Sequence, residues 1–123
     1  MAANFFQRRK ILKKTNYLLL TPIRVHKHKV EENGNVTLIV PKFKKKWMRT
    51  LFIPSRKSEH FRIILDEIGS TTWLAIDGRS DVQTICNRLS VQLGDKMDNA
   101  EERVTKFLTL LYDQRYVTFK EIL

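Results

Sequence analysis

The segment IILDEIGSTTWLAIDGRSDVQT, residues 63–84, carries the clearest succession of structural signals in this chain. Large and β-branched apolar residues open it and favour the end of a strand. A helical stretch follows, and Asp77-Gly78 ends that stretch. Ser80 and Gln83 then stand at capping-box spacing, which predicts the start of another helix. The segment therefore predicts a strand, a short helix, a turn and a second helix, in that order.

A β-hairpin is predicted before this segment. Its arms, Ile23–Glu32 and Asn35–Phe43, flank Asn33-Gly34, and an Asn-Gly pair favours a two-residue turn in which both residues have positive φ. Apolar residues alternate along the second arm, as in a strand with one buried face. Phe61–Leu65 is rich in apolar and β-branched residues and is the predicted third strand.

Three helices are predicted after the third strand, over about residues 66–76, residues 81–93 and from about residue 98 onward. Gly78 and Gly94 stand where the first two would end, and Asp98 with Glu101 has capping-box spacing. The second and third helices each carry one apolar stripe that would face the core. These stripes are Val82, Ile85, Cys86, Leu89 and Leu93, and Ala100, Val104, Phe107, Leu108 and Leu111. Residues 116–119 fit either a final short strand or a tail.

The predicted fold class is α+β. The N-terminal hairpin and the third strand would form a three-stranded antiparallel sheet, and the three helices follow it in a winged-helix-like arrangement whose last two helices form a helix-turn-helix unit. Trp73 is predicted to pack under the sheet. We expect one domain over residues 22–123, with a basic insertion at about residues 42–58. A basic lead-in over residues 1–21 fits a short docking helix, a membrane-surface helix or a poorly ordered terminus.

The 123 residues carry a formal net charge of +10, and the excess lies in the first half of the chain. Residues 1–60 contain 15 Lys and Arg against 3 Asp and Glu, whereas residues 61–123 contain 8 against 10. A basic half implies an acidic partner, such as nucleic acid, anionic lipid, an acidic peptide or an acidic protein face. The alternative is a solvated edge that keeps the protein soluble.

No pattern in the sequence predicts catalysis, a metal site or a cofactor. Cys86 is the single cysteine and lies on an apolar stripe, and no base is signalled to activate it. His26 and His28 share one side of a predicted strand, but no further ligand joins them at metal-site spacing. The sequence contains no phosphate-binding loop, no signal peptide and no apolar run long enough to span a membrane. We therefore expect a non-enzymatic, cytoplasmic protein.

One face of the third predicted helix carries an apolar residue that the core does not need. Arg103, Leu110 and Gln114 fall together on this face, beside Phe107. If the third strand is a sheet edge, the strand and this face frame a groove. An extended peptide could pair there with the strand main chain and press apolar side chains onto the helix. Alternatively, Leu110 covers part of the core or contacts a second copy of the protein, which leaves a homodimer open.

The helix-turn-helix order also raises DNA binding, with the net charge in its favour. A DNA-reading helix directs Arg, Lys, Asn or Gln into the groove. The third helix is instead nearly neutral, with Glu101 and Glu102 in its first turn. A DNA-binding regulator would need the hairpin or the Lys44–Arg49 loop as a basic wing, so nucleic acid is the less favoured partner.

The chain also resembles the PqqD family, the coenzyme PQQ synthesis protein D-like domains that act as recognition elements for ribosomally made precursor peptides. The residues that match the family signature are Leu65, Gly69, Trp73, Asp77, Gly78, Ser80, Val82 and Ile85. The resemblance covers residues 65–117 well, including the closing FLTLLYDQRYV, and covers Pro22–Pro41 loosely. Arg115-Tyr116 stands where many family members have a glycine.

This resemblance implies a peptide chaperone without a catalytic function. Family members bind the leader of a precursor peptide between the third strand and the third helix, and present it to a modifying enzyme that is often a radical-SAM protein. Carried onto this chain, the resemblance implies a peptide-binding site made by the strand and the helix. Its residues are Arg62, Ile63, Ile64, Arg103, Phe107, Leu110 and Gln114. Leaders are often acidic, and the basic half of the chain would attract one over long range.

Overall fold

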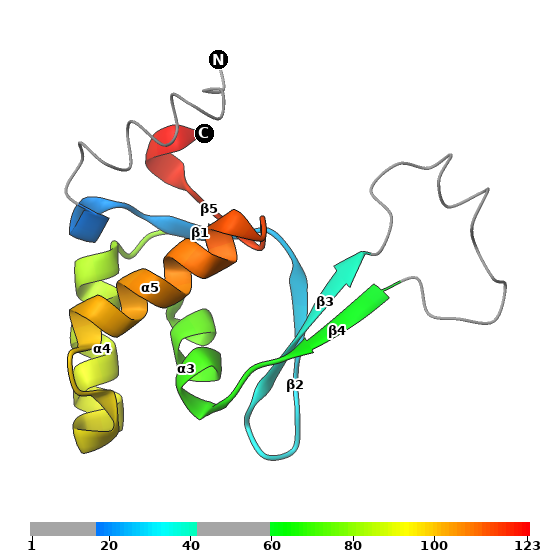
Figure 1. Cartoon of the computed structure of the whole chain (residues 1–123), viewed down its shortest axis with the longest axis horizontal. Helices are drawn as coiled ribbons and strands as arrows, with labels where there is room; N and C mark the ends of the chain where they lie inside the picture. Colours follow the sequence, from blue (N-terminus) through cyan, green and yellow to red (C-terminus); the bar gives the residue numbers. More distant parts are fainter. Residues whose placement is uncertain (1–16, 42–59) are drawn as a thin grey trace, which may run out of the picture.

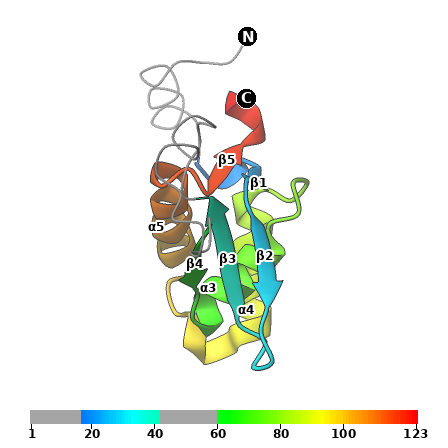
Figure 2. The same ribbon diagram turned by 90° about the vertical axis from the view of Figure 1, so that its right-hand side faces the viewer.

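The computed structural model describes residues 17–41 and 60–123. A three-stranded antiparallel sheet in the order β2-β3-β4 stands beside three helices, which all lie on one of its sides (Figures 1 and 2). The strands are β2 (Lys27–Val30), β3 (Val36–Pro41) and β4 (His60–Ile64), and the helices are α3 (Glu67–Ala75), α4 (Val82–Leu93) and α5 (Ala100–Asp113). The predicted α+β class, with an antiparallel sheet of three strands followed by three helices, is confirmed. The predicted basic insertion and the Lys44–Arg49 loop lie outside the described residues.

The last residues of the predicted lead-in are packed into the structure. A short 3-10 helix, η1 (Tyr17–Leu19), precedes Leu20, whose side chain is fully buried. The Leu20 carbonyl accepts a hydrogen bond from the Val82 main-chain N–H at the start of α4 (2.9 Å). Residues 1–16 of the lead-in lie outside the described part of the chain.

The first arm of the predicted hairpin is divided between two sheets. Within this arm, β1 (Pro22–Arg24) pairs with β5 (Val117–Phe119), whereas β2 pairs with β3. The Val25 N–H continues the first pairing by donating to the Tyr116 carbonyl (3.0 Å), after which the chain bends into β2. The prediction of one continuous strand over residues 23–32 is therefore wrong. Local alternation could not show that the partner of β1 comes from the C-terminal end of the chain. Of the two alternatives for residues 116–119, a final short strand or a tail, the strand is the one that forms.

The hairpin turn has three residues instead of the predicted two. The Glu31 N–H donates to the Asn35 carbonyl (2.8 Å), and the Gly34 N–H donates to the Glu31 carbonyl (2.9 Å). Only Gly34 of the Asn-Gly pair has positive φ, at 85°. The Asn33 side chain instead accepts a hydrogen bond from the Asn35 N–H (2.9 Å). This arrangement is the turn followed by a left-handed glycine that three-residue hairpins favour.

Aspartates cap the first two helices. The Asp66 side chain accepts from the main-chain N–H three residues later at the start of α3 (2.7 Å), and Asp81 does the same for α4 (2.9 Å). The predicted capping box at Ser80 is wrong, because the Ser80 hydroxyl bonds Asp77 (3.0 Å). The main-chain N–H groups of Ser80 and its predecessor also bond Asp77, and these bonds lower the pKa of its carboxyl group. The Asp77-Gly78 turn is thus stabilised by its own aspartate.

The start of α5 also differs from the predicted capping box at Asp98. Its N-cap is Asn99, which has a φ of 55° and forms no side-chain cap bond. A short 3-10 helix, η2 (Gly94–Met97), shifts the boundary by connecting α4 to α5. Capping-box spacing could not distinguish Asp98 from Asn99. Each has a side-chain oxygen, and each is followed three positions later by a glutamate.

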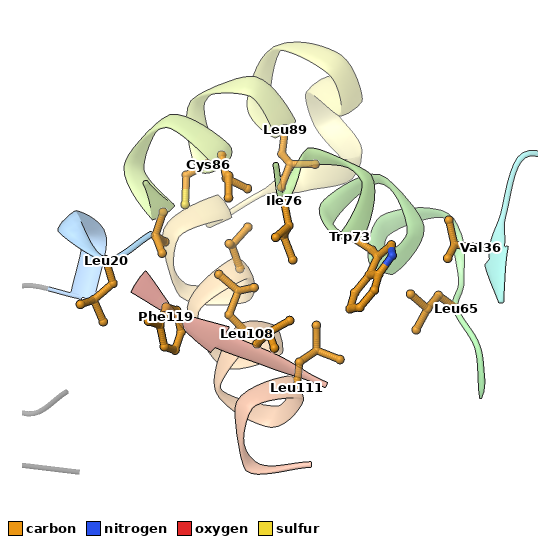
Figure 3. Close-up of a cluster of buried hydrophobic side chains, with 14 of the residues drawn as sticks. Leu20, Val36, Leu65, Trp73, Ile76, Cys86, Leu89, Leu108, Leu111 and Phe119 are labelled. Atoms are coloured by element: carbon orange, nitrogen blue, oxygen red, sulfur yellow. The ribbon is translucent and has the colours of Figure 1, made fainter. Parts of the chain in front are cut away.

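The core lies between the helices and the inner face of the sheet. Trp73 is fully buried, and in Figure 3 its ring lies near Val36 and Leu65. Most residues in the apolar stripes of α4 and α5 are buried in the same cluster, and the half-buried Leu93, Ala100 and Phe107 pack against it. Cys86 is buried among these residues, and burial raises the pKa of its thiol to about 11. The predicted core positions are therefore confirmed.

Helix α5 ends at a residue with an unfavourable conformation. The N–H groups of Arg115 and Tyr116 donate to the carbonyls of Tyr112 (2.9 Å) and Leu111 (2.8 Å), which is the Schellman arrangement. Arg115 has a φ of 65° in this motif, and only glycine adopts that region without a cost of about 1–2 kcal/mol. A glycine at this position would fit the backbone directly.

We expect Arg115→Gly to stabilise the protein by about 1 kcal/mol, because it removes the left-handed penalty at an exposed position. Chemical denaturation of both proteins measures the difference. Arg115→Ala is the control, since alanine keeps the penalty and should leave the free energy of unfolding within about 0.5 kcal/mol of wild type. A glycine variant no more stable than the alanine variant would contradict the prediction.

Candidate functional site

Strand β4 is an edge strand of the described sheet, and part of its main chain points outward. The Leu65 N–H, just beyond the strand, donates to the Val36 carbonyl (2.9 Å). Hydrogen bonding alternates along an antiparallel pair, so Ile63 also bonds β3. Arg62 and Ile64 then direct their N–H and C=O groups away from β3. The edge therefore offers donors and acceptors at alternate residues to an incoming strand.

The Ser70 hydroxyl fastens the end of β4 to helix α3. It accepts a hydrogen bond from the Val36 N–H (2.7 Å) and donates to the Leu65 carbonyl (3.2 Å). The hydroxyl thus occupies the place of one direct bond between the strands. Because Ser70 is only 2 % exposed, these two main-chain groups have little access to water. This bridge fixes where the edge strand ends relative to the helices.

A hollow of about 430 Å³ opens between the end of β4, helix α3 and helix α5. Its lining is Ile64, Leu65, Asp66, Ile68, Gly69, Thr72, Met97, Arg103 and Phe107. Gly69 permits a close approach here, because a Cβ atom at this position would lie 3.4 Å from the Phe107 ring and 3.1 Å from the Asp66 carboxylate. The tighter of these two contacts is with the Asp66 carboxylate, so the glycine leaves room for the side chain that caps α3, and the Phe107 ring lies beside it.

Arg103 provides the positive charge of the hollow. Its Nη1 donates to the Lys96 carbonyl at the end of η2 (2.9 Å), which holds the exposed side chain in place. Within the described part of the chain, no carboxylate forms an ion pair with this guanidinium. Its remaining donors are available to an acidic ligand.

The structure brings three of the seven predicted site residues together, because Ile64, Arg103 and Phe107 line the hollow. Leu110 is 55 % exposed on α5, one helical turn beyond Phe107. Gln114 is the C-cap of α5 and is also exposed. These two extend the same helix face beyond the hollow and do not line it.

The remaining predicted strand residues have different orientations. Ile63 lies opposite the fully buried Leu38 and is half-buried on the inner face. Arg62 lies opposite Ile39, on the face away from the helices. Alternation along the strand therefore separates these side chains, and Arg62 can reach an edge ligand chiefly through its main chain.

Some lining residues were not identified from the sequence. Gly69 and Thr72 are spaced to face α5 along α3, and Met97 belongs to η2. The spacing of Gly69 and Thr72 on one helix face was a usable signal. Met97 had no such signal, because its place depends on the irregular connection between α4 and α5.

A larger hollow, of about 550 Å³, lies on the other side of α3, between the hairpin tip and α4. Its lining is mostly polar, and its one cation, Arg88, already bonds the Ser80 hydroxyl (2.9 Å) and pairs with Asp77 (3.6 Å). It contains no sheet edge. The smaller hollow beside β4 is therefore the better candidate for binding an extended ligand.

Two further features, a cluster of metal ligands and a membrane-spanning helix, are absent from residues 17–41 and 60–123. No group of three or more potential metal ligands is present in these ranges. The rings of His26 and His28 contact different partners, Tyr116 (5.7 Å between ring centroids) and Trp73 (6.2 Å). None of the helices in these ranges has both the length and the apolar character needed to cross a bilayer.

Comparison with known protein families gave one finding. A family model described as Coenzyme PQQ synthesis protein D (PqqD) matches residues 59–117. No curated protein and no solved structure matches the chain significantly. The matched segment begins next to β4 and runs through α5 to the start of β5. It therefore includes β4 and α5, the strand and the helix that border the smaller hollow.

Proposed function

We propose that this chain, which belongs to the PqqD family through residues 59–117, is a peptide-binding chaperone without catalytic function. It binds the leader of a ribosomally made precursor peptide and presents the peptide to a modifying enzyme. The family is associated with PQQ synthesis, and its members are accessory proteins. The observation that carries the proposal is the open edge of β4 beside the hollow formed with α5.

The edge supplies the attachment of the leader. An extended peptide can bond the outward main-chain groups of Arg62 and Ile64 and become a fourth strand of the sheet. Main-chain bonds of this kind depend little on side-chain identity, so they give affinity to any extended segment. Specificity must come from the side chains that the peptide directs towards α5.

Helix α5 supplies that specificity. Phe107 and Leu110 offer apolar surface to every second side chain of the added strand. Arg103 offers a charged hydrogen bond to a carboxylate at the η2 end of the groove. The structure therefore suits a leader that combines large apolar residues with at least one acidic residue.

A titration followed by NMR tests this function. The full chain, labelled with ¹⁵N, is mixed with synthetic leader peptides encoded beside its gene, and with random duplex DNA in parallel. We expect micromolar peptide binding, with the largest shifts at residues 63–65 and 103–114. Salt-sensitive DNA binding without a response to any peptide would overturn the proposal and favour a DNA-binding regulator.

A further inference from the structure

The outer face of the β2-β3-β4 sheet, on the side away from the helices, combines cations with apolar side chains. Residues that lie directly opposite each other in antiparallel strands share a face. The register gives two rows across the strands, Lys27, Ile39 and Arg62 in one and Lys29, Thr37 and Ile64 in the next. No described helix lies in front of this face in Figure 2.

The cations of this face are poorly balanced by nearby acids. Lys29 forms a long ion pair with Glu31 (3.8 Å), and both side chains are exposed. Lys27 and Arg62 form no ion pair with any described residue. Ile39 is half-buried between these two cations, and Ile64 is 78 % exposed. A complementary surface would bring carboxylates around an apolar centre.

This combination fits a protein surface better than nucleic acid. Phosphates would gain from the three cations, but covering two isoleucines would add little to phosphate contacts. A protein interface gains from both, because apolar contact lies at its centre and charged groups lie at its rim. The rows place one isoleucine between two cations and the other at the sheet edge, which matches that pattern.

We infer that this outer face docks an acidic, partly apolar surface of the modifying enzyme while the leader occupies the groove between β4 and α5. The inference rests on the proposed function. Ile64 belongs to both places, since it lines the hollow and lies in the second row of the outer face. A leader added to the β4 edge directs alternate side chains to the outer face. The docked enzyme therefore contacts protein and leader together, and binds the leader-bound form more tightly than the free form.

Binding of the full chain to the modifying enzyme encoded beside its gene tests the inference. Affinity is measured by calorimetry, with and without the leader, for wild type and for Lys27→Glu with Lys29→Glu. The matched control is Arg79→Glu with Lys120→Glu, which makes the same change in net charge at exposed residues outside the sheet. Lys27→Gln with Lys29→Gln removes the charges without reversing them.

We expect the outer-face Glu pair to weaken enzyme binding at least tenfold, the Gln pair to have an intermediate effect, and the control to stay within threefold of wild type. Leader affinity should stay unchanged in all variants, which separates this result from failure of the proposed function. Equal enzyme affinity of the outer-face and control pairs would overturn the inference. Absence of wild-type binding, or displacement of the enzyme by duplex DNA at equal concentration, would overturn it as well.

Discussion

Arg103→Glu combined with Leu110→Asp is expected to weaken leader binding at least 30-fold, the loss of about 2 kcal/mol that marks an interface hot spot. The first change turns the cation that would meet a leader carboxylate into an anion. The second places a charge where apolar leader side chains would pack. Leu110 is 55 % exposed, and Arg103 is an exposed residue whose guanidinium reaches the Lys96 carbonyl. The free energy of unfolding should therefore change by no more than about 1 kcal/mol.

The matched control for this double variant is Val91→Asp with Arg79→Glu. Val91 is an apolar residue of α4 that is 87 % exposed and does not line the hollow beside β4. The same chemical changes are thus made away from the groove. Calorimetric titration of the leader compares both proteins with wild type. If the folded groove variant bound the leader as tightly as the control, the site would have to lie elsewhere.

Ser70→Ala is expected to destabilise the protein by about 2–4 kcal/mol. The change removes the partner of two buried main-chain groups, the Val36 N–H and the Leu65 carbonyl, and each unsatisfied group costs about 1–3 kcal/mol. The variant should also bind the leader more weakly, because the end of β4 is no longer fixed against α3. Urea denaturation gives the stability, and the NMR titration gives the affinity.

Thr71→Ala is the control for the serine variant. The Thr71 hydroxyl donates only to the Glu67 carbonyl of its own helix (2.8 Å), in an exposed position. Its removal should change the free energy of unfolding by less than about 0.5 kcal/mol. Equal stability of the two variants would show that the buried bridge contributes little.

Much of the candidate site was predictable because it depends on local periodicity. The helical spacing that places Arg103, Leu110 and Gln114 on one face follows from the geometry of an α-helix. Side-chain alternation identified the strands and their inner faces. The sequence did not show whether the third strand would lie at the edge of the sheet. The sheet order shows that β4 is an edge strand of the described sheet.

Other features of the site depend on contacts between distant residues. The bridge from Ser70 to Val36 joins residues 34 positions apart in the chain. Alternation separates Ile63 from Arg62 and Ile64 in the sequence, but only the register with β3 shows that Ile63 is the one that faces the helices. Neither feature has a local pattern from which it could be recognised.

The sequence by itself determined the element types, the core stripes and the helix face of the groove, because hydrophobic periodicity and turn residues act over a few positions. Tertiary structure decided which strand pairs with which, and it joined β1 to β5 rather than to the hairpin. It also decided that Phe107 lies beside Gly69, where both line the hollow. These outcomes depend on packing between segments far apart in the chain, where the better burial of several elements together outweighs the preference of any one of them.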